Sequence, residues 1–331
     1  MTAAEPLAVV GGLATLLVVK ASLVALAGAL AIGVSESRRA GSARAGTVAV
    51  CALVALPLLV LVLPRWELPL LAIPHALVAD RGPVRSPAAW IGALWLAGTL
   101  VALARLANDV RAARGLVRRA TASLDARAWP MVRAIATRLR FRGPIELRAS
   151  ADLVTAALLG WRRPVLLLPA RCTDWSDEEL FAVLRHEMEH VRRRDWLALV
   201  VARIAAALYW PNPIVHLVNR RAALARELAA DDAVLRAGVR PEAYARRLMA
   251  VARDVARGEA HAGAVAFAVD GVDVRVRALF AEHAAAPSPL AARAIAPLAT
   301  LPLLVVLAAA QPWICLPTPA APTAAIPVSC P

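Results

Sequence analysis

Hydrophobic residues gather in four long runs along the chain, and polar residues fill the stretches between them. The runs cover residues 7–34, 47–63, 88–106 and 291–310. Each is close to the roughly 20 apolar residues that a helix needs to cross the hydrocarbon core of a bilayer. The pattern therefore predicts a mostly α-helical membrane protein with four transmembrane helices.

The long segment between the third and fourth runs mixes polar and apolar positions, as a water-facing domain does. Helical spacing of apolar residues predicts a helix over 116–140, and short apolar or alternating stretches predict strands at 144–148 and 164–169. The predicted organisation is three transmembrane helices within 1–110, an α+β domain at 111–288, a fourth transmembrane helix at 289–311 and a Pro/Ala-rich tail at 312–331.

The predicted domain contains an HExxH pattern at residues 186–190. Positions i and i+4 of a helix lie on one face, one turn apart, so His186 and His190 can both reach a single metal ion. Glu187 lies to the side, where it can accept a proton from a water molecule at the metal. The competing interpretation is a charged surface helix with incidental histidines.

The helix that contains this pattern is predicted to run from Asp177 to Arg193. Ser176 and Glu179 are spaced as a capping box, which marks a helix start. Charged residues flank the pattern on both sides, whereas a site for proteolysis inside the membrane would lie within an apolar span. We therefore expect the site at the cytoplasmic surface, close to the bilayer.

A catalytic zinc site usually has three protein ligands and one position left open, so a third ligand is needed. A helix predicted over 217–237 has Glu227 and Asp231 one turn apart on the same face. Glu227 would complete the ligand set, and Asp231 would orient a ligand imidazole from behind. A solvated acidic stretch beside arginines explains the same spacing equally well, so the residues alone leave both interpretations open.

Composition supports the membrane assignment and orients it. The chain is 60% hydrophobic, has a mean hydropathy of +0.61 and carries a net charge of +14, almost wholly from arginine. The first loop and the segment after the third run are rich in arginine, whereas both ends of the chain lack it. The positive-inside rule then places both termini outside and residues 107–288 in the cytoplasm. No nucleic-acid-binding module accompanies the basic charge, and the cysteines lack the spacing of a zinc site.

Three features are left open by the sequence. Residues 196–210 are apolar except for Arg203, which favours a buried or membrane-grazing helix over a further span. Lys20 lies within the first run, either as a functional charge or as a packed one. Cys315 and Cys330 in the tail are compatible with a disulfide or with two free thiols.

Taken together, these motifs resemble the membrane metallopeptidases of the BlaR/MecR type. The likeness covers most of the chain and includes 163–169 (RPVLLLP), the HExxH pattern, Asp195, 210–213 (WPNP), 227–232 (ELAADD) and Tyr244. The resemblance implies that His186, His190 and Glu227 bind Zn²⁺. It also implies that Glu187 is the general base and that Asp231 supports the site.

The resemblance implies regulatory peptide hydrolysis at the cell membrane. The substrate would be a cytoplasmic protein, such as a transcriptional repressor of the BlaI/MecI type, or the chain itself, with no direct contact to nucleic acid. The best-known members continue after the fourth span into a penicillin-binding sensor; here about twenty residues follow, without its SxxK pattern. Two alternatives stay open: a quality-control or processing peptidase of the HtpX and CAAX-prenyl-protease group, and a non-catalytic membrane signal transducer.

The sequence does not identify the group that would stabilise the oxyanion of the reaction. Tyr209, His216 and Arg226 are candidates.

Overall fold

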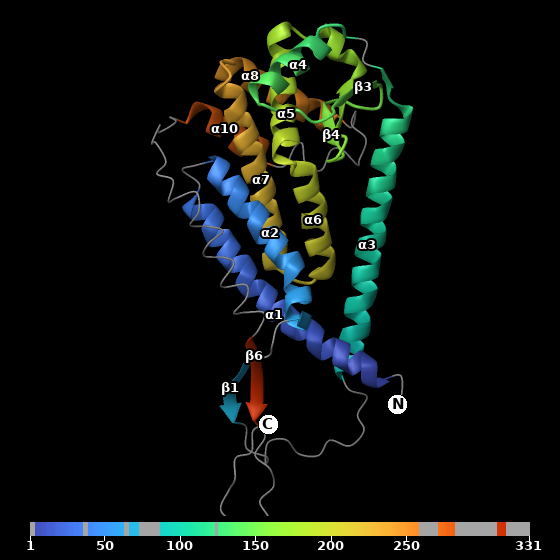
Figure 1. The fold of residues 1–331 in the computed structure, drawn as a ribbon, viewed down its shortest axis with the longest axis vertical. Coiled ribbons are helices and arrows are strands. Elements are labelled where there is room, and N and C mark those ends of the chain that lie inside the picture. The colour runs from blue at the N-terminus through green and yellow to red at the C-terminus, as the bar shows by residue number, and fades with distance from the viewer. Residues whose placement is uncertain are drawn as a thin grey trace, which may run out of the picture.

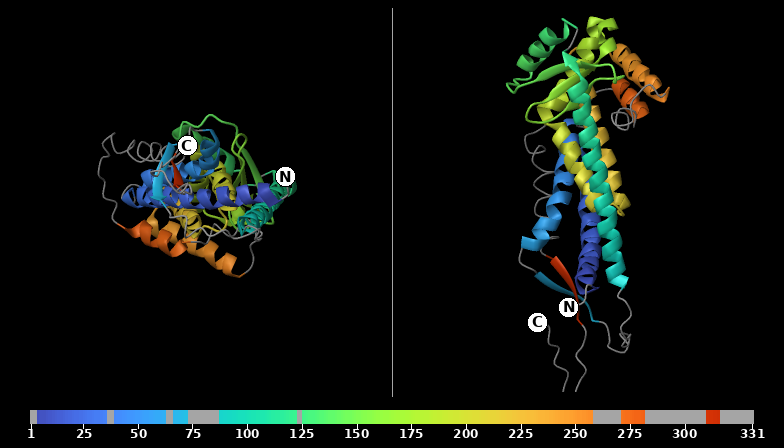
Figure 2. Two further views of the ribbon diagram at one scale, coloured as in Figure 1. Left: turned by 90° about the horizontal axis from the view of Figure 1, so that it is seen from below. Right: turned by 90° about the vertical axis from the view of Figure 1, so that its right-hand side faces the viewer.

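The computed structural model shows an elongated, mostly helical protein (Figure 1). Long helices form a bundle, and a smaller domain of helices and one sheet caps one end of it (Figure 2). The structure describes residues 4–35, 39–62, 66–72, 87–122, 125–257, 271–281 and 310–315.

The three predicted N-terminal spans are helices in the structure. They are α1 (Ala4–Val34), α2 (Arg39–Val62) and α3 (Pro87–Arg119). All three contain stretches long and apolar enough to cross a membrane, at Leu17–Val34, Arg39–Val60 and Trp90–Arg119. The predicted fourth span, 291–310, lies outside the described residues except for its last position.

The prediction of one helix over 116–140 is wrong, because the helical structure is interrupted in the middle of this range. Helix α3 continues to Arg119, strand β2 (Thr121–Ala122) follows, and a separate helix α4 (Ala128–Arg138) begins afterwards. The Asp125 carboxylate accepts a hydrogen bond from the Arg127 backbone N–H at 2.9 Å and pairs with the Arg127 guanidinium. This local turn precedes the second helix, although the helical spacing of apolar residues continues across it.

A four-stranded sheet forms the centre of the capping domain. Its order is β2-β3-β5-β4, with β3 (Glu146–Ser150) and β5 (Val165–Pro169) parallel and β4 (Ala157–Leu159) antiparallel to β5 at the edge. The strands β3 and β5 confirm the two predicted strands. Strand β5 is buried throughout, and its alternate side chains enter two different cores.

The HExxH helix α5 (Asp177–Arg193) packs against this sheet and α4. Leu180, Leu184 and Met188 are fully buried in the core between them. Their spacing of four residues places one face of α5 on the core, so the adjacent face is available to the two histidines.

Two helices return from the capping domain into the membrane bundle as a hairpin (Figure 1). They are α6 (Asp195–Leu208) and α7 (Pro213–Leu235), and they pack against α1, α2 and α3. The Tyr209 hydroxyl donates to the carbonyl of Leu53 at 3.0 Å, and the Asn212 amide donates to that of Val18 at 3.2 Å. Both carbonyls lie inside the apolar spans, so the turn between α6 and α7 reaches among the membrane helices, a position that the sequence left open for 196–210.

The start of α7 differs from the sequence prediction. The helix begins at Pro213, one turn before the predicted position 217. Asn212 caps it, because its side-chain oxygen accepts hydrogen bonds from the N–H groups of Ile214 and Val215 at 3.0 and 3.4 Å. An N-cap Asn followed by Pro at the first helical position is a recognisable start signal, and the prediction overlooked it.

Two further helices and a pair of strands complete the described chain. Helices α8 (Pro241–Ala256) and α10 (Val272–Phe280) pack beside α5 and α7 in the capping domain. Strands β1 (Trp66–Ala72) and β6 (Ala310–Cys315) pair in parallel at the opposite end of the bundle (Figure 1).

The close packing of α3 on the hairpin turn gives a testable expectation. A Cβ atom at Gly98 would lie 2.4 Å from the Trp210 ring, which is held there because its Nε1 donates to the Trp95 carbonyl at 3.2 Å. Overpacking of this kind costs about 1–3 kcal/mol. We expect Gly98→Ala to lower the thermal unfolding midpoint of the detergent-solubilised chain by a few degrees. Gly33→Ala is the control, since a Cβ there meets no atom within 4 Å; equal midpoints in the two variants would contradict the packing.

Candidate metal centre

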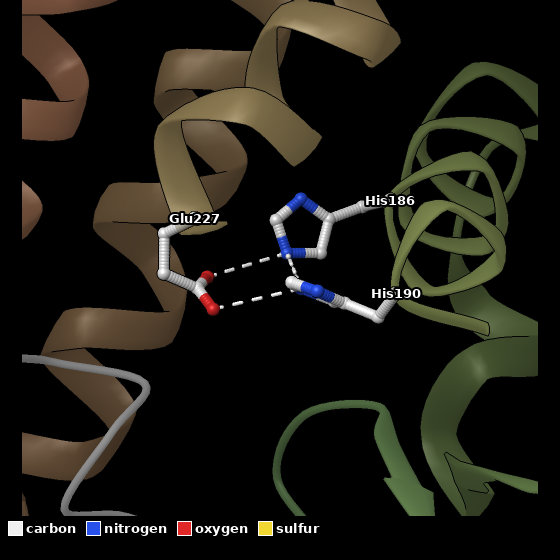
Figure 3. Close-up of side chains that lie close together, drawn as sticks. All are labelled: His186, His190 and Glu227. Atoms are coloured by element: carbon white, nitrogen blue, oxygen red, sulfur yellow. Dashed lines mark hydrogen bonds and ion pairs between the residues drawn. The ribbon is translucent and has the colours of Figure 1, made fainter. Parts of the chain in front are cut away.

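The geometry of the site starts from the capped beginning of α5. The Ser176 hydroxyl accepts from the Glu179 backbone N–H at 3.3 Å, and the Glu179 carboxylate accepts from the Ser176 N–H at 3.0 Å. This is the predicted capping box, and the predicted bounds of the helix are also confirmed. A fixed start sets the rotation of the helix, so His186 and His190 emerge on the side that faces α7 (Figure 3).

Three side chains from α5 and α7 converge on one point (Figure 3). The Nε2 atoms of His186 and His190 are 3.1 Å apart, and the Glu227 carboxylate oxygens lie 3.4 Å from the first and 3.5 Å from the second. Ligand atoms about 2.0–2.1 Å from a tetrahedral zinc ion are roughly 3.3–3.4 Å from one another. The three residues therefore fit such an ion, by both their spacing and their chemistry.

Both imidazoles are held from behind through their Nδ1 atoms. His186 Nδ1 lies 2.9 Å from the Tyr244 hydroxyl and 3.2 Å from the Asp231 carboxylate, and Tyr244 itself donates to Asp231 at 2.8 Å. His190 Nδ1 lies 2.6 Å from the Asp195 carboxylate. A carboxylate on Nδ1 keeps the proton on that nitrogen and leaves Nε2 as the free electron-pair donor.

Asp195 reaches His190 because the chain turns sharply between α5 and α6. Arg194 has a left-handed backbone, with φ 58° and ψ 38°, and it both ends α5 and precedes the first residue of α6. A residue with a Cβ adopts this conformation at a cost of about 1 kcal/mol or more. The turn brings the carboxylate back towards the preceding helix, where it contacts the imidazole.

The two carboxylates that lie behind the imidazoles, Asp195 and Asp231, each have an arginine partner. Arg193 donates to Asp195 from Nη2 at 2.7 Å and from Nε at 3.0 Å. Arg275 of α10 donates to both oxygens of Asp231, at 2.7 and 2.8 Å. Because an unpaired charge in the protein interior is strongly destabilising, the two arginines allow both carboxylates to stay ionised.

The charges of the cluster also favour the binding of a cation. Burial lowers the pKa of His186, but hydrogen bonds and charge from Asp231 and Glu227 outweigh burial and raise this pKa to about 9. Burial raises the pKa of Glu227, yet Arg275 and the two imidazoles hold it well below its usual value. The negative charges of Asp231 and Glu227 thus favour a second proton on His186. A metal ion at Nε2 would replace that proton.

Glu187 lies beside these three side chains on the wall of a cavity of about 1290 Å³. His186, His190 and Glu227 line the same cavity, together with residues of α3, β4 and α6. Within the part of the chain that the structure describes, Glu187 has no hydrogen bond or ion pair. Its carboxylate is available to exchange a proton with a molecule in the cavity.

The structure brings together every site residue that the sequence singled out. His186, His190 and Glu227 form the cluster, Glu187 lies beside it, and Asp231 is behind one imidazole. Sequence reasoning gave no role to four further residues that contact them: Asp195, Tyr244, Arg193 and Arg275.

The candidate oxyanion donors are distributed differently. The Tyr209 hydroxyl donates to Leu53 inside the bundle, and Tyr209 does not line the cavity, so it is not an oxyanion donor in this structure. His216 and Arg226 do line the cavity, although His216 Nε2 is 2.9 Å from the Trp210 carbonyl.

We expect Asp195→Asn to weaken metal binding by about 10–100-fold, the usual cost of losing the carboxylate behind a ligating imidazole. The amide keeps the shape of the side chain but lacks the negative charge that now lies 2.6 Å from His190 Nδ1. Competition with a chromophoric zinc chelator measures the change. Asp273→Asn, at an exposed position of α10, should bind zinc as the wild type does; an equal affinity in Asp195→Asn would show that the contact does not support the site.

Comparison with known proteins identifies the family of the chain. The sequence model of the family described as BlaR1 peptidase M56 matches residues 71–279. The regulatory protein BlaR1 of Bacillus licheniformis is 31% identical over 98 residues, which are 30% of this chain and 16% of that protein. The chain thus aligns with a small part of that relative. Since the family model spans more than half of the sequence, the chain belongs to the BlaR1 peptidase M56 family of membrane metallopeptidases.

Proposed function

We propose that this chain is a membrane-embedded zinc endopeptidase that cleaves a cytoplasmic protein and has a regulatory role. The observation that carries the proposal is the convergence of three potential ligand atoms from two helices beside a cavity that also contains Glu187. Membership of a metallopeptidase family supports it.

In this proposal His186, His190 and Glu227 hold Zn²⁺, which when bound lowers the pKa of a water molecule towards neutrality. Glu187 accepts the proton of the water that attacks the scissile carbonyl and then passes the proton to the leaving amine. Asp231 and Asp195 keep the Nδ1 protons in place, so that both Nε2 atoms face the cluster.

The edge of the sheet suggests how a peptide would reach this site. Strand β4 ends the sheet order, and its residues Ala157, Leu158 and Leu159 line the cavity that contains Glu187. An extended segment can pair with such an edge through its backbone alone. A cavity of about 1290 Å³ is large enough for several residues of a chain, which favours an endopeptidase over an enzyme that trims single residues.

We further propose that the capping domain faces the cytoplasm, with four spans and both termini outside. The arginine-rich sequence of the domain supports this orientation. Helix α10 lies in the capping domain and β6 lies at the opposite end of the bundle, which supports an even number of spans (Figure 1).

The identity of the substrate is a separate proposal. The relative from Bacillus licheniformis is called a regulatory protein, which supports a regulatory role. We propose a cytoplasmic repressor of the BlaI/MecI type as the substrate, with the chain itself as a further one. A quality-control or processing peptidase of the HtpX and CAAX-prenyl-protease group would use the same ligands. A non-catalytic transducer would have no chemical need for a carboxylate at Glu187.

A comparison of cellular proteins tests the proposal. Cells that express the wild-type chain should accumulate fragments of at least one cytoplasmic protein that are absent from cells expressing Glu187→Gln at equal level. Mass spectrometry of new N-termini identifies the cleavage sites, including any in this chain. Identical sets of N-termini in the two strains, across inducing and non-inducing conditions, would favour the non-catalytic transducer.

A further inference from the structure

Arg275 contacts both Glu227, a proposed metal ligand, and Asp231, the carboxylate that lies behind His186. Its Nη1 lies 3.1 Å from Glu227 Oε2, while Nε and Nη2 donate to the two oxygens of Asp231. The side chain is 5% exposed. It reaches the site from α10, a helix that contributes no ligand and no part of the HExxH motif.

We propose that Arg275 is a positioning residue that fixes the orientation of Glu227 for metal binding. The proposal rests on the zinc site proposed above, and it assigns a task to a residue outside that ligand set. Arg275 is anchored by its bidentate contact with Asp231 and acts on the metal through Glu227, the carboxylate that completes the site.

The physical reason is the closeness of two buried acids. Glu227 and Asp231 are one helical turn apart on α7 and lie against the same imidazole, so their negative charges repel each other. A planar guanidinium with five N–H donors can bridge two carboxylates at fixed angles. A lysine ammonium supplies the same charge as a point and cannot hold both carboxylates in one plane.

The helix that carries Arg275 is itself held in place. Arg39, the first residue of α2, donates from Nη2 to the Ala278 carbonyl of α10 at 2.5 Å. At the other end, Gly271 precedes α10 with φ +80°, and a Cβ there would lie 3.0 Å from a methyl group of Leu224 on α7. These contacts hold α10 against both α2 and α7, and a guanidinium needs such a fixed helix if it is to impose an orientation on Glu227.

The test uses the full-length chain in detergent and compares Arg275→Lys and Arg275→Met with Arg277→Met. Arg277 is on the same helix, 82% exposed at its side chain and paired only with Asp273 among the described residues, so it is the matched control. We expect Arg277→Met to bind zinc as the wild type does. Arg275→Lys should fold and lose affinity by about 10–100-fold, and Arg275→Met should lose at least as much. Bound Co²⁺, in place of zinc, should show an altered absorption spectrum in both Arg275 variants.

A double-mutant cycle separates positioning from general damage to the fold. If Arg275 acts through Glu227, then Arg275→Lys should weaken zinc binding in the wild type but have little further effect in a Glu227→Gln background. Equal losses in the two backgrounds, or an unchanged affinity and Co²⁺ spectrum in Arg275→Lys, would overturn the proposal. A wild-type chain that binds no zinc would instead refute the proposed function on which it rests.

Discussion

Glu187→Gln should leave the zinc content at one ion per chain and lower the rate of peptide hydrolysis by about 10²–10⁴-fold, the usual contribution of a positioned general base. Glutamine has nearly the same shape as glutamate but cannot accept the proton of the attacking water. Glu187 is not one of the three converging side chains, so its replacement leaves the proposed ligand set complete. Metal analysis of the purified chain and cleavage of a substrate identified in cells measure the two quantities.

The control for this variant is Glu178→Gln on the same helix. Glu178 is partly exposed near the start of α5 and pairs with Arg240, away from the cavity lining. It should keep both zinc and activity. Activity in Glu187→Gln close to that of the control would exclude Glu187 as the general base, whereas loss of zinc in Glu187→Gln would place this carboxylate among the ligands.

Local patterns predicted those parts of the site that depend on one helix. The HExxH spacing, the capping box at Ser176 and Glu179, and the one-turn separation of Glu227 and Asp231 all follow from helical geometry. What the sequence could not decide was whether the two helices meet. The structure brings Glu227 within 3.5 Å of both Nε2 atoms, which a solvated acidic stretch would not do.

The residues that the prediction missed depend on tertiary structure or on an unusual backbone. Asp195 contacts His190 because Arg194 adopts a left-handed backbone conformation. An arginine in the sequence does not predict that conformation. Arg275 reaches Asp231 from α10, far along the chain, as one arginine among many. A signal was present for Asp195 and Tyr244, which both belong to the family resemblance, but the contact of Tyr244 with Asp231 required the packing of α8 on α7 and α5.

The fold shows the same difference between features that one segment determines and features that depend on tertiary contacts. Hydropathy predicted three spans and the buried strand β5, since each is a continuous apolar run. It failed at 116–140, where strand β2 and a turn at Asp125 divide a continuous helical pattern. It also could not show that the turn between α6 and α7 lies among the membrane helices, because that depends on hydrogen bonds from Tyr209 and Asn212 to carbonyls in α2 and α1.

The hairpin therefore connects the membrane bundle to the site directly. Asp195 begins α6, Glu227 belongs to α7, and the turn that joins the two helices contacts α1, α2 and α3. A displacement of these membrane helices relative to one another would change the contacts of the turn. Glu227, one of the three residues that would hold the metal, and Asp195, which contacts His190, thus belong to the same two helices whose connecting turn makes those contacts.

Glu227→Ala should reduce zinc affinity by more than the roughly 10–100-fold that the loss of an outer hydrogen-bonding partner costs. Alanine removes the only carboxylate within 3.5 Å of both Nε2 atoms among the described residues, and two imidazoles alone leave the ion without its third protein ligand. His186→Ala should have an effect of similar size, because it removes a ligand from the other helix. Glu242→Ala, at an exposed position near the start of α8, is the control and should retain one zinc ion per chain.

Zinc content, measured after exchange against a weak chelator, distinguishes these variants, and a thermal unfolding curve of each metal-free chain checks that it is folded. Arg275 and Asp231 keep their bidentate contact in Glu227→Ala, so the surrounding ion pairs should persist. Wild-type zinc content in a folded Glu227→Ala chain would remove Glu227 from the ligand set. The carboxylate on α7 that remains close to His186 is Asp231, but its distance of 3.2 Å is to Nδ1, on the opposite side of the ring from the cluster. Replacement of the lost ligand by Asp231 would therefore require the imidazole to turn over, which its contact with Tyr244 at 2.9 Å opposes.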